Sequence, residues 1–308
     1  MSEIFNIKSI TEFHQIAGLS EPRHPLIGIY EDEDMKEQAK PEIHDLEGVK
    51  ISTDMYTIMF KDKIRGSMNY GRTSYDFQYG TMVFIAPGQV IEPPDYEGEE
   101  ESHGWVLLFH PDLIRNSTLE RNMNSYTFFD YETNEALHLS KEEQVYMAGV
   151  VKQIKKEYSQ NLDGHSHRLI LSNIELLLNN CLRFYDRQFY TRSGFNKDFV
   201  SRFEKLLKEY FLAEKPIELG IPAVSYFSDE MNMSANYLSD LLKKETGLSA
   251  KGHINKMIIE KAKSALLNST VSVSEIAYDL GFEHPQSLTR LFKSKTGVSP
   301  NEYRNQVN

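Results

Sequence analysis

The sequence is 308 residues long, enough for two domains of ordinary size, and its 40% apolar and 26% charged residues are typical of a soluble globular protein. It contains no run of about 18 apolar residues and no basic start followed by an apolar run, so neither a transmembrane helix nor a secretory signal is expected. A single cysteine, Cys181, excludes an internal disulfide and favours the reducing cytoplasm, with the thiol acting as a small buried apolar group.

The net charge of −11 is unevenly distributed along the chain. Residues 197–308 contain 15 basic and 14 acidic side chains, a net charge of +1, which leaves −12 for the rest. From Met233 onward the net charge is +3. The acidity therefore belongs to the N-terminal part, and the C-terminal part is able to approach phosphate groups.

The chain up to about residue 135 is predicted to be mostly β-structure. Short apolar runs are separated by turn signals such as Pro87-Gly88 and Pro93-Pro94. The runs are Pro25–Tyr30, Met55–Phe60, Thr81–Ala86 and Trp105–Phe109.

From Ser140 the apolar period becomes helical. Ser140 and Glu143 form a capping box, and a second helix is predicted over Ser166–Tyr185. The apolar stripe of this second helix is wide, which indicates burial against its own domain and a second chain. The alternative is a helix packed within its own domain alone. Thr191-Arg192-Ser193-Gly194 is typical of a linker, so we expect domains at 1–190 and 198–308, joined by 191–197.

The last ninety or so residues contain an internal repeat. Tyr237–Ala250 matches Ser287–Pro300 at an offset of fifty residues, and the preceding segments match at forty-nine. The one-residue difference falls between helices, where a turn absorbs it. The matching pairs are Leu238 and Leu288, Leu241 and Leu291, Leu242 and Phe292, Lys243 and Lys293, Thr246 and Thr296, Gly247 and Gly297, Phe227 and Ile276, and Met231 and Leu280.

Each copy has the parts of a helix-turn-helix. In the second copy Ser272 and Glu275 form a capping box, Gly281 ends the first helix and Pro285 begins the next. In the first copy Pro222 opens the first helix, Asn232 lies at the turn, Ser234 caps the second helix and Gly247 ends it, as Gly297 does in the second copy.

A helix over about Ala250–Asn268 joins the copies and spans about 28 Å. Successive major grooves on one side of B-DNA are about 34 Å apart, so the two second helices are able to occupy adjacent grooves. A helical repeat without nucleic acid is the alternative, but such repeats usually need three or more copies and here there are two.

At these residues the sequence resembles the AraC family of bacterial regulators. Ser272–Arg304 is similar to the family's C-terminal signature, and Ser234–Leu267 to its first helix-turn-helix and connecting helix. The resemblance implies an all-α double helix-turn-helix domain that binds double-stranded DNA. It also implies that base edges are read from Asn236, Ser239, Asp240, Gln286, Ser287 and Arg290.

The chemistry of these side chains agrees in part with a role in reading base edges. Arg290 is able to bond guanine bidentately, and Gln286 adenine. Asp240 departs from the family, which often has a basic residue there. The expected phosphate contacts are Ser234, Lys243, Lys244, Lys293 and Lys295, and for the lysines solvation of the helix ends is an equal alternative.

The N-terminal region resembles, less closely, the cupin-like sensor domains of the same family. The likeness lies in Tyr79–Gly88 and Gly104–Ile114. It implies a β-barrel that holds a small effector, followed by helices that form a homodimer. The expected fold class is therefore α+β, with a cupin-like barrel and helices before the all-α domain.

An enzyme is not expected. A cupin metal site needs a His-x-His pair inside the barrel, but His165-x-His167 lies between helices, and Gln89-Val90-Ile91 follows Pro87-Gly88. His103 and His110 are isolated, and neither a Gly-x-Ser-x-Gly elbow nor a phosphate loop occurs. We therefore predict no catalytic residue, no metal and no cofactor.

The sequence predicts a cytoplasmic, sequence-specific DNA-binding regulator with an effector-sensing N-terminal domain. Activation of transcription and contact with RNA polymerase are expectations from the family resemblance. The alternative is a barrel without a ligand that serves for dimerisation or protein contact, and an enzyme with an attached DNA-binding domain is the third and weakest hypothesis. No contact with a membrane is expected.

Overall fold

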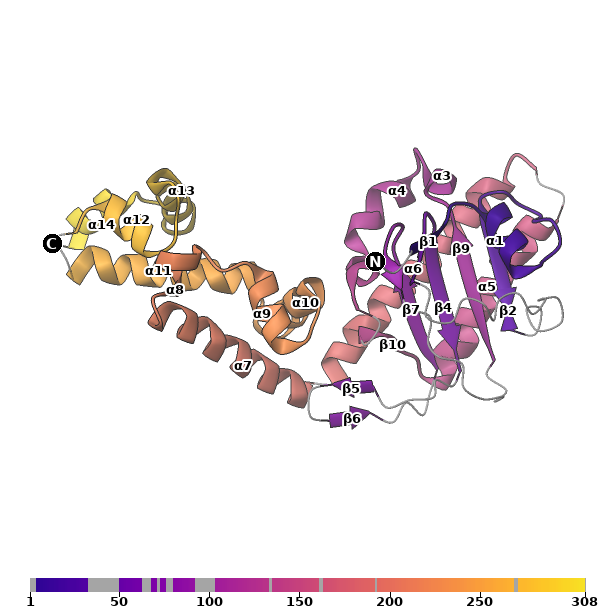
Figure 1. The fold of residues 1–308 in the computed structure, drawn as a ribbon, viewed down its shortest axis with the longest axis horizontal. Coiled ribbons are helices and arrows are strands. Elements are labelled where there is room, and N and C mark those ends of the chain that lie inside the picture. Colours follow the sequence, from indigo (N-terminus) through magenta and orange to yellow (C-terminus); the bar gives the residue numbers. More distant parts are fainter. Residues whose placement is uncertain are drawn as a thin grey trace. The chain divides into compact units, whose positions relative to one another are not determined.

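The computed structural model describes residues 4–32, 50–62, 68–70, 73–75, 80–91, 103–132, 135–160, 163–191, 193–268 and 271–307. The chain divides into two compact units, Met1–Gln188 and Phe189–Asn308 (Figure 1). In the predicted linker, helix α6 ends at Thr191 and α7 begins at Ser193, while Arg192 lies outside the described residues. No helix in the described part of the chain has the length and apolar character needed to cross a membrane.

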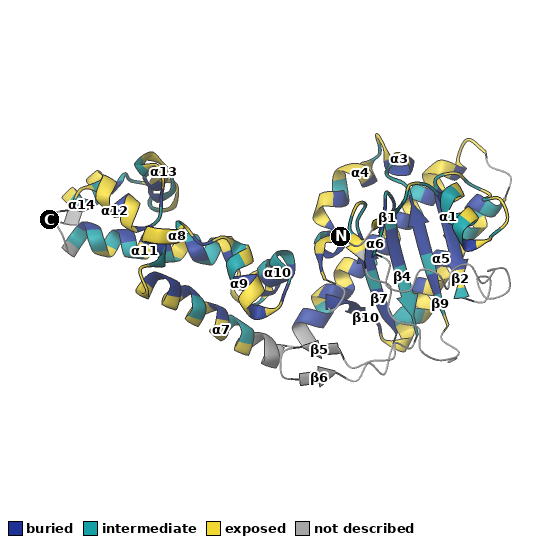
Figure 2. Cartoon of the chain, viewed as in Figure 1, coloured by how far each residue is buried: buried dark blue, intermediate teal, exposed yellow. Residues whose placement is uncertain are grey.

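The first unit is built around a five-stranded antiparallel sheet of order β10-β7-β4-β9-β2. Ile58 in the central strand pairs with Phe84 on one side and Leu107 on the other, and all three side chains are buried. Buried residues make up much of the strands β4, β7 and β9 (Figure 2). Four of these strands coincide with the four apolar runs, which confirms the prediction that these runs form β-structure. The strands are β2 Ile27–Glu31, β4 Tyr56–Lys61, β7 Thr81–Ile85, β9 Gly104–Phe109 and β10 Leu137–His138.

Two smaller sheets complete the described β-structure of this unit. One joins β1 (Ile4–Ile7), β3 (Lys50–Thr53) and β8 (Val90–Ile91), and the other pairs β5 (Met68–Tyr70) with β6 (Thr73–Tyr75). Within the described ranges none of the sheets closes on itself, because β2 and β10 are the two edges of the largest one. The fold is thus a mixture of helix and sheet, and a closed barrel is not shown.

The β-rich region also contains helices that the apolar runs did not predict. Helix α1 (Ile10–Ala17) begins at Ser9, whose hydroxyl accepts the N–H of Glu12, and ends at Gly18 with φ of 66°. Ile10 and Ala17 on its inner face are buried. Short turns of helix follow the last long strand: α3 Pro111–Ile114, α4 Thr118–Asn122, and the 3₁₀ turns Met123–Ser125 and Thr127–Asp130.

Two long helices end the first unit, α5 (Lys141–Ser159) and α6 (Ser166–Thr191). The predicted capping box is present at the start of α5, where Ser140 and Glu143 exchange side-chain and backbone hydrogen bonds. Cys181 lies on the buried face of α6, and burial raises the pKa of its thiol well above the usual range. The wide apolar stripe of α6 therefore covers the core, but Leu169, Leu176 and Leu182 remain exposed.

The second unit is all helical, with α11 as its central element (Figure 1). Helix α11 contacts α10, α12, α13 and α14, so it joins both copies of the repeat. Its buried side chains include Ile254, Ile258, Ala262 and Leu266. The helices are α7 Ser193–Leu212, α8 Lys215–Leu219, α9 Val224–Met231, α10 Ala235–Thr246, α11 Ala250–Asn268, α12 Val273–Asp279, α13 Pro285–Thr296 and α14 Pro300–Val307.

Candidate nucleic-acid interface

The second copy of the repeat is a helix-turn-helix made of α12 and α13. Ser272 caps α12 by accepting the N–H of Glu275, and the Glu275 carboxylate accepts the N–H of Ser272 at 2.8 Å. Hydrogen bonding of its carboxylate to the Ser272 side chain, and then to the Ser272 backbone, holds the pKa of Glu275 below its ordinary value. After α12, Gly281 has a φ of 88°, and Phe282 is buried in the turn.

Helix α13 buries one face and exposes the other. Leu288 and Phe292 are almost fully buried, whereas Gln286, Ser287 and Arg290 are exposed, as the repeat pattern predicts. Arg290 makes no ion pair with Glu283 or with any other carboxylate in the described part of the chain. The guanidinium is therefore available to a ligand, which is a property that a base-reading arginine needs.

The first copy is built from α9 and α10 with the same local devices. Asn232 follows α9 with a φ of 54°, in the left-handed region that asparagine tolerates. Ser234 caps α10 by accepting the N–H of Tyr237 at 3.2 Å. Gly247 ends α10 with a φ of 79°, and its N–H donates to the carbonyl oxygen of Lys243.

The candidate readers on α10 differ from those on α13 in exposure. Asn236, Ser239 and Asp240 are half-buried, and Asn236 and Asp240 each have a further interaction within the chain. Ser234, which was predicted to contact phosphate, has its hydroxyl oxygen engaged in the cap. Among the described residues, the candidate readers on α10 thus include fewer unengaged polar side chains than those on α13.

The predicted phosphate lysines lie at the ends of the two second helices. Lys243 and Lys244 are exposed in the last turn of α10, and Lys293 and Lys295 in the last turn of α13. A cation in the last turn of a helix also stabilises the helix dipole. The geometry is therefore compatible with both roles that the sequence left open.

Helices α10 and α13 both end at a threonine, Thr246 and Thr296. The two threonines match in the internal repeat, but the sequence did not indicate their role. The Thr246 hydroxyl donates to the Leu242 carbonyl at 2.7 Å, and the Thr296 hydroxyl donates to the Phe292 carbonyl at 2.8 Å. Each hydroxyl oxygen also accepts the N–H of the second residue that follows it. Thr-Gly thus closes both helices in the same way, which confirms that the repeat is structural.

Arg304 is another residue whose role the sequence analysis missed. From α14 its guanidinium donates to the carbonyl oxygens of Leu266 at 3.2 Å and Val271 at 2.6 Å. It thereby fastens the end of α11 to the start of the second motif. The capping pair Ser299 and Glu302 at the start of α14 gives no sign of this longer reach.

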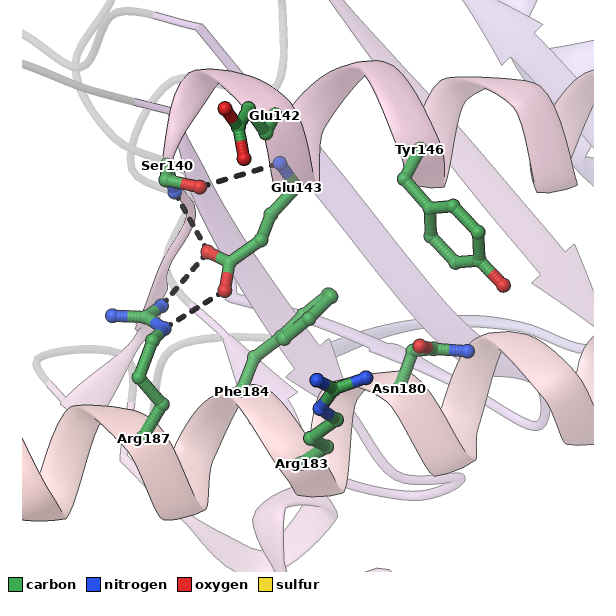
Figure 3. Close-up of a pocket in the computed structure, with 8 residues that line it drawn as sticks. All are labelled: Ser140, Glu142, Glu143, Tyr146, Asn180, Arg183, Phe184 and Arg187. Atoms are coloured by element: carbon green, nitrogen blue, oxygen red, sulfur yellow. Dashed lines mark hydrogen bonds and ion pairs between the residues drawn. The ribbon is translucent and has the colours of Figure 1, made fainter.

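The first unit contains an open hollow of about 480 Å³ between α5 and α6 (Figure 3). Arg187 donates to both carboxylate oxygens of Glu143 at 2.8 and 3.0 Å, so this pair is neutralised within the wall. Small-molecule pockets are mostly apolar, whereas this lining is mostly charged or polar. The lining residues are Ser140, Glu142, Glu143, Tyr146, Asn180, Arg183, Phe184 and Arg187.

The histidines considered in the sequence have structural contacts. His167 Nε2 lies 2.9 Å from the Leu113 carbonyl oxygen, and His110 caps α3 by accepting the N–H of Asp112. His103 lies 3.5 Å from an Asp62 carboxylate oxygen. Among the described residues no group of three or more His, Cys, Asp or Glu side chains is placed to hold a metal ion.

Comparison with known proteins bears on the second unit. Residues 227–306 match the protein family described as Helix-turn-helix domain. YesN of Bacillus subtilis, an uncharacterized transcriptional regulatory protein, is 37% identical over 92 residues, which cover 28% of this chain and 25% of YesN. RhaS of Escherichia coli O157:H7, an HTH-type transcriptional activator, is 32% identical over 77 residues, or 25% of this chain and 28% of RhaS.

The C-terminal region is an AraC-family helix-turn-helix domain. This confirms the resemblance inferred for that region. AraC-family domains bind DNA and are not enzymes. The chain spans about a quarter of the length of these curated relatives, so the shared part is this AraC-type domain.

Solved structures of similar domains include one with DNA. The C-terminal domain of AraT, a response regulator from Geobacillus stearothermophilus, is 29% identical, and the match covers 35% of this chain and 84% of that one, with a TM-score of 0.31. The DNA-binding domain of AdpA, solved in complex with a target DNA, is 26% identical, and the match covers 32% of this chain and 90% of that one, with a TM-score of 0.28.

Proposed function

We propose that this chain is a sequence-specific transcriptional regulator that reads double-stranded DNA chiefly through α13 and secondarily through α10. The observation that carries the proposal is the outer face of α13. Gln286, Ser287 and Arg290 are exposed there and their side chains have no partner among the described residues, while Leu288 and Phe292 on the opposite face are buried. A recognition helix needs this arrangement, because base edges are reached by side chains that the fold does not already engage.

DNA selection tests this proposal. The full chain is incubated with a library of random duplexes, and we expect it to enrich one sequence, which residues 197–308 should also bind. With a net charge of only +1 in that region, affinity should fall less steeply with salt than for a strongly basic domain. Weak binding without any enriched sequence would contradict the proposal.

We propose that residues 198–308 form the DNA-binding domain and that residues 1–190 form a cupin-like domain that dimerises and senses an effector, with 191–197 between them. Exposed leucines on α6 support dimerisation: Leu169 and Leu176 are seven residues apart, on one stripe, and are 44% and 41% exposed. Asn173 and Asn180 lie on the same stripe, and their amides donate to the backbone of α6 at 2.9 and 2.7 Å. Such a seam fits a second copy of α6.

Charge substitution tests the dimer. Leu176→Glu should convert a homodimer to a monomer in sedimentation at micromolar concentration, because it places a carboxylate in the apolar seam. Leu182→Glu is the matched control, since Leu182 is exposed to a similar extent, 38%, on another side of the helix. A wild-type chain that sediments as a monomer, or equal effects of both variants, would contradict a dimer through this stripe.

The remaining parts of the proposal rest on the description of one relative and on the family resemblance of the sequence. RhaS is described as an activator, and we extend activation, with RNA polymerase as the partner, to this chain. We also propose a cytoplasmic location and no enzymatic activity for the whole chain. A reporter gene placed behind the selected DNA sequence should rise in expression when the chain is supplied, and a fall would indicate repression instead.

A further inference from the structure

Two recognition helices on one chain select DNA by spacing only if their relative position is fixed. Here the covalent connection between the two motifs is α11, which packs against α10 at one end and α12 and α13 at the other. Each motif packs on this helix, and Arg304 ties the second motif to its end, so α11 sets the distance between the motifs. A direct contact between the motifs would constrain their relative orientation as well.

The second point of contact is a direct approach of backbone to backbone. A Cβ atom added to Gly281 would lie 2.5 Å from the carbonyl carbon of Gly220, 2.7 Å from the nitrogen of Ile221 and 2.9 Å from the Gly220 oxygen. All three distances are below those that real Cβ atoms make, so the turn of the second motif touches the segment that leads into the first.

Other contacts hold the Gly220 segment to α7 and to the first helix of the first motif. The Tyr210 hydroxyl donates to the Gly220 carbonyl at 3.0 Å, which ties the segment to α7. From α8, the Lys215 ammonium donates to the Tyr226 hydroxyl on α9 at 2.8 Å and lies 5.2 Å from the centre of that ring. The rings of Tyr210 and Tyr226 meet edge to face at 5.0 Å.

We infer that the contact between Gly220 and Gly281 is a positioning device that fixes α13 relative to α10, so that the chain accepts DNA with two subsites at one spacing. This inference rests on the proposed function. Gly281 would then be a glycine for two reasons: its φ of 88° and the absence of room for any side chain. At the equivalent turn of the first copy, Asn232 has a φ of 54° and carries a side chain.

The glycines of this unit offer a matched control. Gly247 has a φ of 79°, similar to that of Gly281, but a Cβ added to it meets nothing within 4 Å. Gly247→Ala therefore introduces backbone strain alone, whereas Gly281→Ala introduces similar strain and forces the two motifs apart. Any difference between the two full-length variants reports the contact.

The experiment measures affinity on three duplexes: the sequence selected by the wild-type chain, and the same sequence with one base pair inserted or removed between its subsites. Wild type and Gly247→Ala should lose about 100-fold in affinity on the altered spacings, since one base pair displaces and rotates the second subsite. Gly281→Ala should bind the three duplexes within about threefold of one another, with unchanged base preference inside each subsite.

Melting curves show whether Gly281→Ala folds, and Tyr210→Phe provides a milder second test, because it removes the hydrogen bond to Gly220 while keeping the ring. Tyr210→Phe should reduce the spacing penalty in part. The inference would be overturned if Gly281→Ala folds and loses as much affinity on the altered spacings as wild type does. If Gly281→Ala does not fold, an unchanged loss in Tyr210→Phe would overturn it. A wild type that enriches one sequence without any spacing preference would also overturn it, whereas failure to enrich any sequence would refute the proposed function itself.

Discussion

The two helix-turn-helix motifs have similar residues at their equivalent buried positions and different residues at their exposed positions. Leu242 and Phe292, which are equivalent in the repeat, are both fully buried, and Thr-Gly closes both second helices. On the outside, Arg290 of α13 is exposed and unpaired among the described residues, whereas Asp240 of α10 is half-buried and engaged. The two copies therefore share the buried residues that fold the motif and differ at the candidate base readers.

The first helices of the motifs are also stabilised by different chemistry. Helix α12 is capped by Ser272 and Glu275, while α9 has no side-chain cap at Ala223. Tyr226, which occupies the place of Glu275 in the repeat, instead accepts a hydrogen bond from Lys215. One motif thus depends on a carboxylate and the other on an ammonium group.

The largest difference between the motifs should be seen with Arg290→Ala. Loss of a bidentate contact to guanine should cost about 1–3 kcal/mol on the selected duplex and relax base preference at one position. Affinities on the selected duplex and on its single-base variants measure both effects. Arg290→Lys is the control, because it keeps the charge but lacks the planar fork, so it should relax preference with little change in salt dependence.

The opposite result for Arg290 is equally clear. If Arg290→Ala weakens binding to all duplexes alike, the side chain contacts phosphate or only positions its helix, and α13 is then no more a reader than α10.

A smaller effect should separate the capped helix from the uncapped one. Ser272→Ala should destabilise the second unit by about 1 kcal/mol at neutral pH, since it removes the cap of α12. Ala223→Ser should not destabilise α9, and a stabilisation would show that the first motif lacks only the cap. The free energy of unfolding is measured by denaturant titration of the full chain, with the helical signal as the readout. Equal destabilisation by Ser272→Ala and Ala223→Ser would contradict this difference between the two helices.

The two stabilising charges should respond to pH in opposite directions. The folded pKa of Glu275 is depressed by the bonds to Ser272, so its contribution is complete above its ordinary value of 4.5 and is lost as the pH falls through the folded value. The folded pKa of Lys215 is raised, first by the hydrogen bond to Tyr226, so its contribution is complete below its ordinary value of 10.5 and is lost as the pH rises.

The melting temperatures of two variants check these signs. The deficit of Glu275→Gln relative to wild type should vanish in acid, and the deficit of Lys215→Met should vanish in alkali. A deficit that is constant across the pH range would show that the side chains act through packing and not through their charges.

The smallest effect is expected for Asp240→Ala. It should change affinity on the selected duplex by less than about 1 kcal/mol, because Asp240 is half-buried and already has an interaction within the chain. Binding to unrelated DNA should strengthen slightly, since a charge repelled by phosphate is removed. Asp240→Asn separates charge from hydrogen bonding, and a large loss of base preference in either variant would make α10 an equal reader.

The sequence predicted well wherever the signal is local. Caps at Ser140, Ser234 and Ser272 were predicted because a hydroxyl residue before an apolar helical stretch bonds backbone only a few residues away. The strands β2, β4, β7 and β9 and the outward face of α13 follow in the same way from apolar spacing.

Contacts between distant segments were not predictable. Helix α1 falls in a region of short apolar runs, and its place depends on packing against residues such as Tyr30 and Met55. Arg304 contacts Leu266, 38 positions away in the chain, and Gly220 contacts Gly281, 61 positions away. The residues next to Arg304 and Gly220 in the sequence do not indicate these contacts. The half-burial of Asn236 likewise depends on tertiary surroundings that periodicity does not describe.

The buried thiol on α6 gives the protein a built-in reporter of opening. Cys181 is the one cysteine in the sequence, it is fully buried, and its raised pKa keeps it protonated. A thiol reagent can therefore react only when the first unit opens around α6, without background from any other site. The labelling rate would therefore measure how often the first unit opens around α6 in the unmodified chain. A small molecule that slows the labelling would be identified as a ligand of that unit.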